Sequence, residues 1–145
     1  SLDLSKYRVK GITFITKPLS HREIIDLYRE HHVSIQISSH EGLGLGFYEA
    51  LATETPVITL NQAPHNEVIR DKKNGWLLPS TPFDLEDNNQ ALVKGGKCHP
   101  QDLTALITRL GDQPEEIFSL KETLKGEKKK WSPDLFSQRL IKCLS

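Results

Sequence analysis

Apolar residues along the chain gather in short runs that are separated by stretches with helical spacing. Four short runs of apolar and β-branched residues are bounded by turn residues, which is typical of strands. They cover residues 11–15, 33–37, 56–60 and 75–78. Parallel strands need a crossover that is usually a helix, so the alternation predicts a parallel sheet with helices on its faces. The expected fold class is α/β and Rossmann-like.

Helix signals fill the gaps between these predicted strands. Ser20 is a predicted N-cap, and Glu23 three residues later completes a capping box before an apolar stripe that continues to Tyr28. A short second helix is predicted over residues 46–53 and a third over residues 64–70. The first three predicted strands are thus each followed by a helix.

The second half of the chain is less regular. Residues 80–99 are rich in Asp, Asn, Gly, Lys and Pro and predict a long surface loop, inserted before the next helix. Apolar residues at helical spacing predict a helix over residues 100–111, and two further helical stretches follow it. The last of them starts at Ser132, with a proline at the first helical position and an apolar stripe behind it. We expect residues 1–131 to form one partial domain and residues 132–145 to form a C-terminal helix.

Composition narrows the classes of function. The chain has 145 residues, a length typical of one domain, and its 19 basic and 19 acidic residues give a formal net charge of zero. This balance does not favour a nucleic acid as a partner, and a small or neutral ligand fits better. Cys98 and Cys143 belong to no metal-ligand pattern, so no metal site is predicted. Because methionine and any apolar run of about 20 residues are absent from the sequence, we expect a part of a longer, soluble, cytoplasmic protein.

The segment from Ser38 to Ala52 carries the candidate chemistry. Its glycines at positions 42, 44 and 46 follow a predicted strand and open a predicted helix, at the sheet edge where α/β proteins bind ligands. Backbone N–H groups can approach a ligand closely there, and the first helical turn favours an anion. Glu41 and Glu49 would repel a phosphate, which indicates that they accept hydrogen bonds from hydroxyl groups of a sugar or a ribose.

The glycines and glutamates of this segment also allow other interpretations. The glycine spacing fits neither the dinucleotide-binding fingerprint nor the Walker phosphate loop. Composition alone also allows a glycine-rich turn with two solvated glutamates. His65 and Asn66 follow the third predicted strand, so both a contact with the ligand and a structural role remain open for them.

The same segment resembles the E-x7-E signature of the family 4 retaining glycosyltransferases, P-S-x-x-E-G-F-G-L-P-x-x-E-A-x-A-x-G-x-P-V-I. The matching residues are Ser38, Glu41, Gly42, Gly44, Leu45, Glu49, Ala50, Ala52, Pro56, Val57 and Ile58. Residues 8–79 resemble the family closely, and residues 100–110 resemble it more loosely. The sequence departs from the pattern at Ile37, Leu43, Gly46 and Glu54, none of which removes a glutamate or a key glycine.

This resemblance implies the donor-binding, C-terminal part of a GT-B-fold glycosyltransferase that transfers a sugar from a nucleotide-sugar with retention. It gives Glu41 a catalytic role in positioning the sugar rather than the role of a nucleophile. It places Glu49 on the ribose hydroxyls of the donor. The other donor contacts that it implies are His40, Gly42, Leu43, Gly44, Leu45, Thr16 and Lys17. No cofactor and no metal is expected, because the nucleotide-sugar is a substrate.

The expected partners follow from the same resemblance. A glycan or lipid-linked acceptor would bind through a missing N-terminal domain, toward which the helix of residues 132–145 would pack, so the chain alone is expected to be inactive. Lys128, Lys129 and Lys130 could meet an anionic membrane surface or form a solvated helix end. Two alternatives are a GT-B sugar-nucleotide epimerase and a degenerate module that binds nucleotide-sugars without catalysis.

Overall fold

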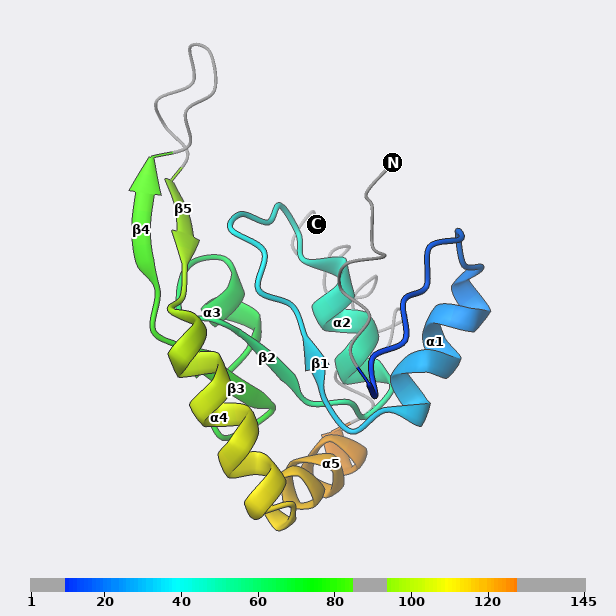
Figure 1. Ribbon diagram of the computed structural model, residues 1–145. Coiled ribbons are helices and arrows are strands. Elements are labelled where there is room, and N and C mark those ends of the chain that lie inside the picture. Colours follow the sequence, from blue (N-terminus) through cyan, green and yellow to red (C-terminus); the bar gives the residue numbers. More distant parts are fainter. Residues whose placement is uncertain (1–9, 85–93, 128–145) are drawn as a thin grey trace, which may run out of the picture.

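The computed structural model describes residues 10–84 and 94–127 (Figure 1). A parallel three-stranded sheet lies at its centre, in the order β1-β2-β3. Its strands are β1 (Ser34–Ile35), β2 (Val57–Leu60) and β3 (Gly75–Leu78). The helices are α1 (His21–Glu30), α2 (Leu45–Ala52), α3 (His65–Val68), α4 (Pro100–Asp112) and α5 (Glu115–Glu127). The predicted α/β class and its parallel sheet are confirmed.

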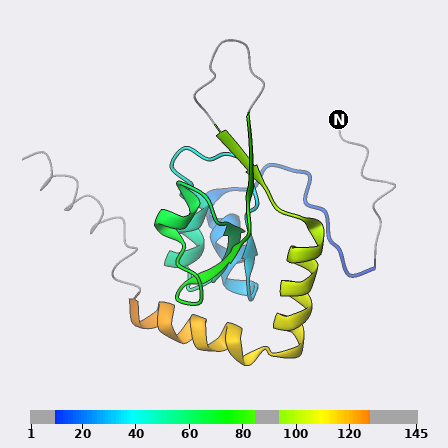
Figure 2. The same cartoon turned by 90° about the vertical axis from the view of Figure 1, so that its left-hand side faces the viewer.

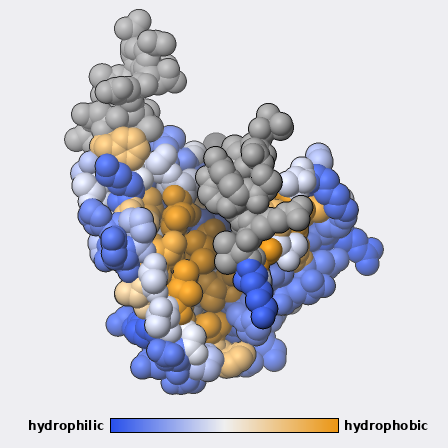
Figure 3. All heavy atoms as spheres, in the orientation of Figure 1, coloured by the Kyte–Doolittle hydropathy of each residue, from blue (hydrophilic) through white to orange (hydrophobic). Residues whose placement is uncertain are grey.

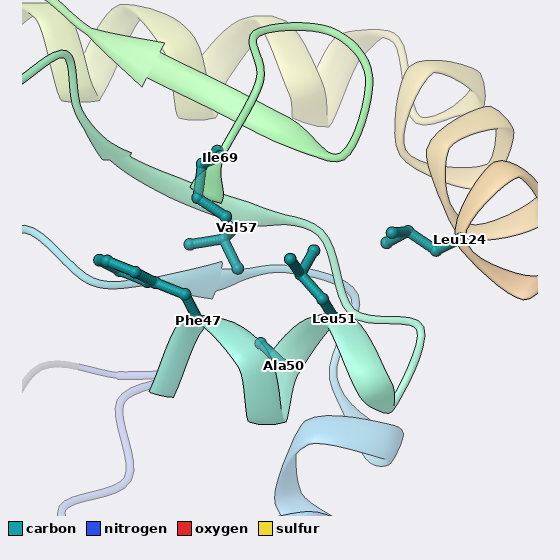
Figure 4. Close-up of a cluster of buried hydrophobic side chains, with 6 residues drawn as sticks. All are labelled: Phe47, Ala50, Leu51, Val57, Ile69 and Leu124. Atoms are coloured by element: carbon teal, nitrogen blue, oxygen red, sulfur yellow. The ribbon is translucent and has the colours of Figure 1, made fainter. Parts of the chain in front are cut away.

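Two clusters of buried side chains hold helices against the two faces of the sheet. Because side chains alternate along a strand, Val57 faces one cluster and Ile58 faces the other. Figure 4 shows Phe47, Ala50 and Leu51 of α2 directed toward Val57, with Leu124 of α5 on the same side. The second cluster consists of Ile58, Leu60, Trp76, Leu78, Leu110 and Leu120. Helix α5 therefore contributes to both clusters, through Leu120 and Leu124.

Helix α1 begins as the sequence predicts. The Glu23 backbone N–H donates to Ser20 Oγ at 3.3 Å, and the Ser20 backbone N–H donates to Glu23 Oε2 at 2.8 Å. This reciprocal pair satisfies two N–H groups that have no partner inside the helix. At the other end, His31 Nδ1 lies 2.6 Å from the carbonyl oxygen of Leu27. The capping box is confirmed.

The predicted strand over residues 11–15 is wrong. These residues have no strand geometry, and Ile12, Phe14 and Ile15 are 55%, 41% and 48% exposed. A run of apolar residues becomes a strand only beside a hydrogen-bonded neighbour. In the part of the chain that the structure describes, β1 is the edge of the sheet and no strand pairs with its outer side. Figure 3 shows apolar side chains gathered between α4 and β1, where Ile35 is 46% exposed.

The prediction of a surface loop over residues 80–99 is wrong at both ends of that segment. Strands β4 (Thr81–Asp84) and β5 (Lys94–Lys97) form an antiparallel pair. Figure 2 shows this β4–β5 hairpin extending from the end of the sheet opposite to α5. Glycines in β5 and a proline in β4 hide the strand signal, because neither residue type favours a strand interior. Backbone pairing, which needs no apolar pattern, holds the hairpin.

Some predictions concern residues that the structure does not describe. The helix from Ser132 lies among them, as does Cys143, whereas α5 accounts for the first of the two predicted C-terminal helical stretches. No helix within residues 10–84 and 94–127 is both long and apolar enough to cross a membrane.

Candidate functional site

The glycine-rich loop connects β1 to α2 at the carboxyl ends of the parallel strands (Figure 1). Gly44 is the N-cap of α2 and has φ 60° and ψ 45°, a left-handed conformation that L residues adopt at a cost. A Cβ on Gly44 would lie 2.5 Å from Cδ2 of Phe47, whereas one on Gly42 would have no neighbour within 4 Å. Gly44 is therefore required both for the turn and for the packing of Phe47 under it.

The glycine-rich loop carries backbone N–H groups without a partner in the described part of the chain, on the exposed Gly42, Leu43 and Leu45 and on the buried Gly44. Among residues 10–84 and 94–127, no acceptor receives a hydrogen bond from the N–H of Gly42, Leu43, Gly44 or Leu45. The last two open α2, where the unpaired N–H groups carry the positive end of the helix dipole. No acidic residue lies in the first turn of α2. The loop thus presents several donors to an anion at one place.

Glu41 is held beside this row of donors. Ser38 Oγ donates to Glu41 Oε1 at 2.5 Å, and both side chains are partly buried. The short bond to a charged acceptor fixes one carboxylate oxygen and leaves the other for a further donor. Ser38 was one of the residues that carried the family resemblance, so the contact gives it a physical role.

His65 lies under the loop and is fully buried. Thr59 Oγ1 donates to the carbonyl oxygen of Gln36 at 2.7 Å, so its single proton is already used. His65 Nδ1, at 2.8 Å from Thr59 Oγ1, must therefore be the protonated nitrogen. Its Nε2 is then a bare acceptor, and it is buried with no hydrogen-bond partner among the described residues. The ring also packs edge-on against Phe47, with centroids 5.2 Å apart.

Burial lowers the pKa of His65 below its ordinary value of 6.5, and His40 lowers it further, although the nearby Glu41 raises it. We expect the full-length protein to lose stability as the pH falls below 6.5, because the unfolded chain then binds a proton that the folded His65 resists. The replacement His65→Gln should flatten this part of the profile of denaturation midpoint against pH. His99→Gln, at an exposed histidine, is the control. An identical pH profile in wild type and His65→Gln would contradict the expectation.

Glu49 lies on the side of α2 that faces α1. Its Oε1 is 3.7 Å from Nδ1 of His21, in the first turn of α1. Burial, and then the negative charge of Glu49, raise the pKa of the hydroxyl of Tyr28 in α1. No hydrogen bond or ion pair in the described part of the chain joins Glu49 to Glu41. That both carboxylates face one bound donor stays a prediction.

The remaining candidates lie on exposed positions around these two glutamates. Lys17 Nζ is 3.8 Å from Oε1 of Glu23, which lies in the first turn of α1, the turn that Glu49 approaches. Lys17 also lines a hollow of about 270 Å³. Thr16 and His40 are exposed. Leu43 and Leu45 are 77% and 66% exposed, so their side chains point away from the core and only their backbones can belong to an anion site.

Two residues near the loop escaped sequence reasoning. Gln36 Nε2 donates to the carbonyl oxygen of Gly46 and to Ser34 Oγ, both at 3.0 Å, and so ties the end of β1 to the first turn of α2. Tyr28 was assigned only to the apolar stripe of a helix. The alternation of Ser34 and Gln36 in a strand was the one signal that two polar side chains share a face.

The chain is similar to parts of two curated proteins. The chain is 29% identical over 112 residues to the UDP-N-acetylglucosamine–peptide N-acetylglucosaminyltransferase GtfA subunit of Streptococcus pneumoniae serotype 4 (strain ATCC BAA-334 / TIGR4), covering 75% of this chain and 22% of that protein. It is 39% identical over 56 residues to the putative glycosyltransferase EpsD of Bacillus subtilis (strain 168), covering 39% of this chain and 15% of that protein. The chain therefore spans less than a quarter of the length of either relative.

The fold also has a counterpart among solved structures. The crystal structure of the GtfA/B complex matches 74% of this chain and 20% of the matched chain, with a TM-score of 0.53 at 21% sequence identity. This likeness concerns the fold.

The family model described as glycosyl transferases group 1 matches residues 3–116. Since that match covers well over half of the 145 residues, the chain belongs to the group 1 glycosyl transferases.

Proposed function

We propose that this chain is the donor-binding part of a retaining, family 4 glycosyltransferase that transfers a hexose from a nucleotide-sugar to an acceptor. The segment from Glu41 to Glu49 is its E-x7-E motif. The whole protein carries the activity, and the chain alone does not turn over, because the acceptor binds to another domain. A glycan or a lipid-linked molecule is the proposed acceptor.

One observation carries this proposal: four successive residues, 42–45, have N–H groups without a described acceptor, and they lie at the carboxyl edge of a parallel sheet. A diphosphate is the part of a nucleotide-sugar that needs such donors. The loop carries no lysine or arginine, so the backbone and the helix dipole supply the attraction. Gly42, Leu43 and Leu45 are exposed, so a ligand can approach this segment from the solvent.

The two glutamates account for the parts of the donor that are not phosphate. Carboxylates accept hydrogen bonds from hydroxyl groups, and the sugar and the ribose supply these. Glu41, fixed by Ser38, is the proposed contact of the transferred sugar. Glu49, beside His21, is the proposed contact of the ribose. The base lies near Thr16 and Lys17 in this proposal.

The relatives guide the choice of donor for the first test. The GtfA subunit is named for UDP-N-acetylglucosamine, so UDP and UDP-N-acetylglucosamine are the first ligands to titrate into the full-length protein. The matching GDP- and ADP-sugars test the other bases. Calorimetric binding of one nucleotide-sugar, together with its consumption in the presence of acceptor, supports the proposal. If no nucleotide and no nucleotide-sugar binds, the proposed function is wrong.

Replacement of Glu49 by alanine in the full-length protein should weaken nucleotide affinity by about 1.5 to 3 kcal/mol, the range for a hydrogen bond to a charged group. Calorimetry with the preferred nucleotide measures the change. His21→Gln is the matched control, because it removes the exposed partner of Glu49 but leaves the carboxylate in place. If Glu49→Ala binds the nucleotide as tightly as wild type does, Glu49 does not bind the ribose.

A further inference from the structure

The three loops that follow the parallel strands are joined to one another by side-chain hydrogen bonds. Ser39 follows β1, Gln62 follows β2, and Ser80 follows β3. Ser80 Oγ donates to Gln62 Oε1 at 2.7 Å, and Gln62 Nε2 donates to the carbonyl oxygen of Ser39 at 2.9 Å. The side-chain amide of Gln62 therefore links the loop after β3 to the start of the glycine-rich loop.

The β4–β5 hairpin joins this connection from the other side. The backbone N–H of Gly96, in β5, donates to the same Ser39 carbonyl oxygen at 2.8 Å. Both lone pairs of this oxygen are therefore used, one by a side chain and one by a strand. Ser39 is only two residues before Glu41 and three before Gly42, the first of the loop glycines.

Two donors on one carbonyl fix the orientation of a peptide unit. The peptide plane that carries the Ser39 carbonyl also carries the His40 N–H, and the two groups point in opposite directions. With the carbonyl turned to Gln62 and Gly96, the His40 N–H is turned away from the hairpin. The direction in which the chain enters the Glu41 turn is set by the same plane.

Gly96 has no room for a side chain at this point. A Cβ there would overlap Gln62 Oε1 and Ser80 Oγ. Both atoms are the ends of flexible side chains, so an added methyl group would push Gln62 aside rather than break the backbone. The hairpin and the amide of Gln62 are therefore packed together against a single carbonyl of the loop.

From these contacts we infer that Gln62, Ser80 and Gly96 are positioning residues, which hold the glycine-rich loop in the form that binds the nucleotide-sugar. The inference rests on the proposed function. It also gives the β4–β5 hairpin a role in binding, because the hairpin holds the Ser39 carbonyl from outside the parallel sheet. The three residues act on the ligand through the loop and do not touch it.

The full-length protein tests this inference with two independent variants, Gln62→Met and Gly96→Ala. Calorimetry with UDP should show affinity about fivefold weaker in each variant, the equivalent of one net hydrogen bond. Cleavage by chymotrypsin after the exposed Leu43, identified by mass spectrometry, should be several-fold faster without any ligand, because a released loop opens more often. Thr81→Val, at an exposed position in β4, should behave like wild type in both measurements.

Two variants of Ser80 distinguish a role in positioning the loop from a role in the stability of the whole protein. Ser80→Ala removes the donor to Gln62 and should weaken UDP affinity, whereas Ser80→Thr keeps the hydroxyl group and should restore it. Unchanged cleavage after Leu43 in both Gln62→Met and Gly96→Ala would overturn the inference. If wild type binds no nucleotide, the proposed function fails, while the rate of cleavage still decides whether Gln62 and Gly96 hold the loop.

Discussion

Replacement of Glu41 by glutamine is expected to lower kcat for sugar transfer about 100-fold in the full-length enzyme, the size of effect that follows when a reacting group is misplaced by about an ångström. Glutamine has the shape of glutamate, and its amide oxygen can still accept the hydrogen bond from Ser38 Oγ. The charge that would orient the sugar hydroxyl is lost. Fold and loop geometry should therefore survive while transfer does not.

Steady-state consumption of the preferred nucleotide-sugar measures this effect, with kcat and KM determined separately. A smaller change in the KM for the donor than in kcat is expected, because the proposed phosphate donors, the backbone N–H groups of residues 42–45, are unchanged in this variant. Glu122→Gln applies the same chemical change to an exposed residue of α5 and should leave kcat unaltered. A kcat of Glu41→Gln within about threefold of wild type would exclude Glu41 from the reaction.

Replacement of Gly75 by alanine is expected to lower the stability of the sheet by about 3 kcal/mol, at the upper end of overpacking effects. Gly75 is paired with Val57 in the β2–β3 ladder. An added Cβ would overlap the carbonyl oxygen of Val57 and would lie 2.9 Å from Cγ2 of Ile69, which is fully buried. Unlike Gln62 beside Gly96, the carbonyl of Val57 belongs to the backbone of the central strand and cannot move aside.

Hydrogen exchange of the β2 and β3 amides in the full-length protein measures the free energy of opening of this ladder. Gly111→Ala is the matched control. A Cβ on Gly111 meets nothing within 4 Å, and alanine favours the helix in which Gly111 lies by about 0.5 to 1 kcal/mol. Equal protection of the β2 amides in Gly75→Ala and wild type would show that the sheet can absorb the methyl group.

The elements that the sequence predicted correctly are those whose signals are local. The capping box of α1 lies within four residues, and the strands β2 and β3 are short apolar runs bounded by turn residues. Residues 11–15 form the same kind of apolar run. A strand also needs an adjacent strand to pair with, however, and no local pattern shows whether one is present. The error at β4 and β5 was the opposite one. A loop was predicted there, but backbone pairing forms two strands from residues that have no apolar alternation.

The candidate site divides in the same way. The position of the glycine-rich loop between a parallel strand and a helix followed from the pattern of the sequence, and so did the two acidic residues beside it. The contacts that hold the loop could not be predicted, because Gln62 and Gly96 reach Ser39 from loops and strands far along the chain. Burial of His65 was equally hidden, since it depends on Phe47 of α2 packing against α3.

The difference between the first two glycines of the loop has a consequence for protein engineering. Position 44 tolerates no randomisation, because its left-handed backbone and the ring of Phe47 both exclude a side chain. Position 42 has an ordinary backbone and open space, so residues other than proline, which lacks the N–H, can be encoded there without disturbing the turn. A library aimed at new sugar donors should therefore place its diversity at codon 42 and keep codon 44 fixed.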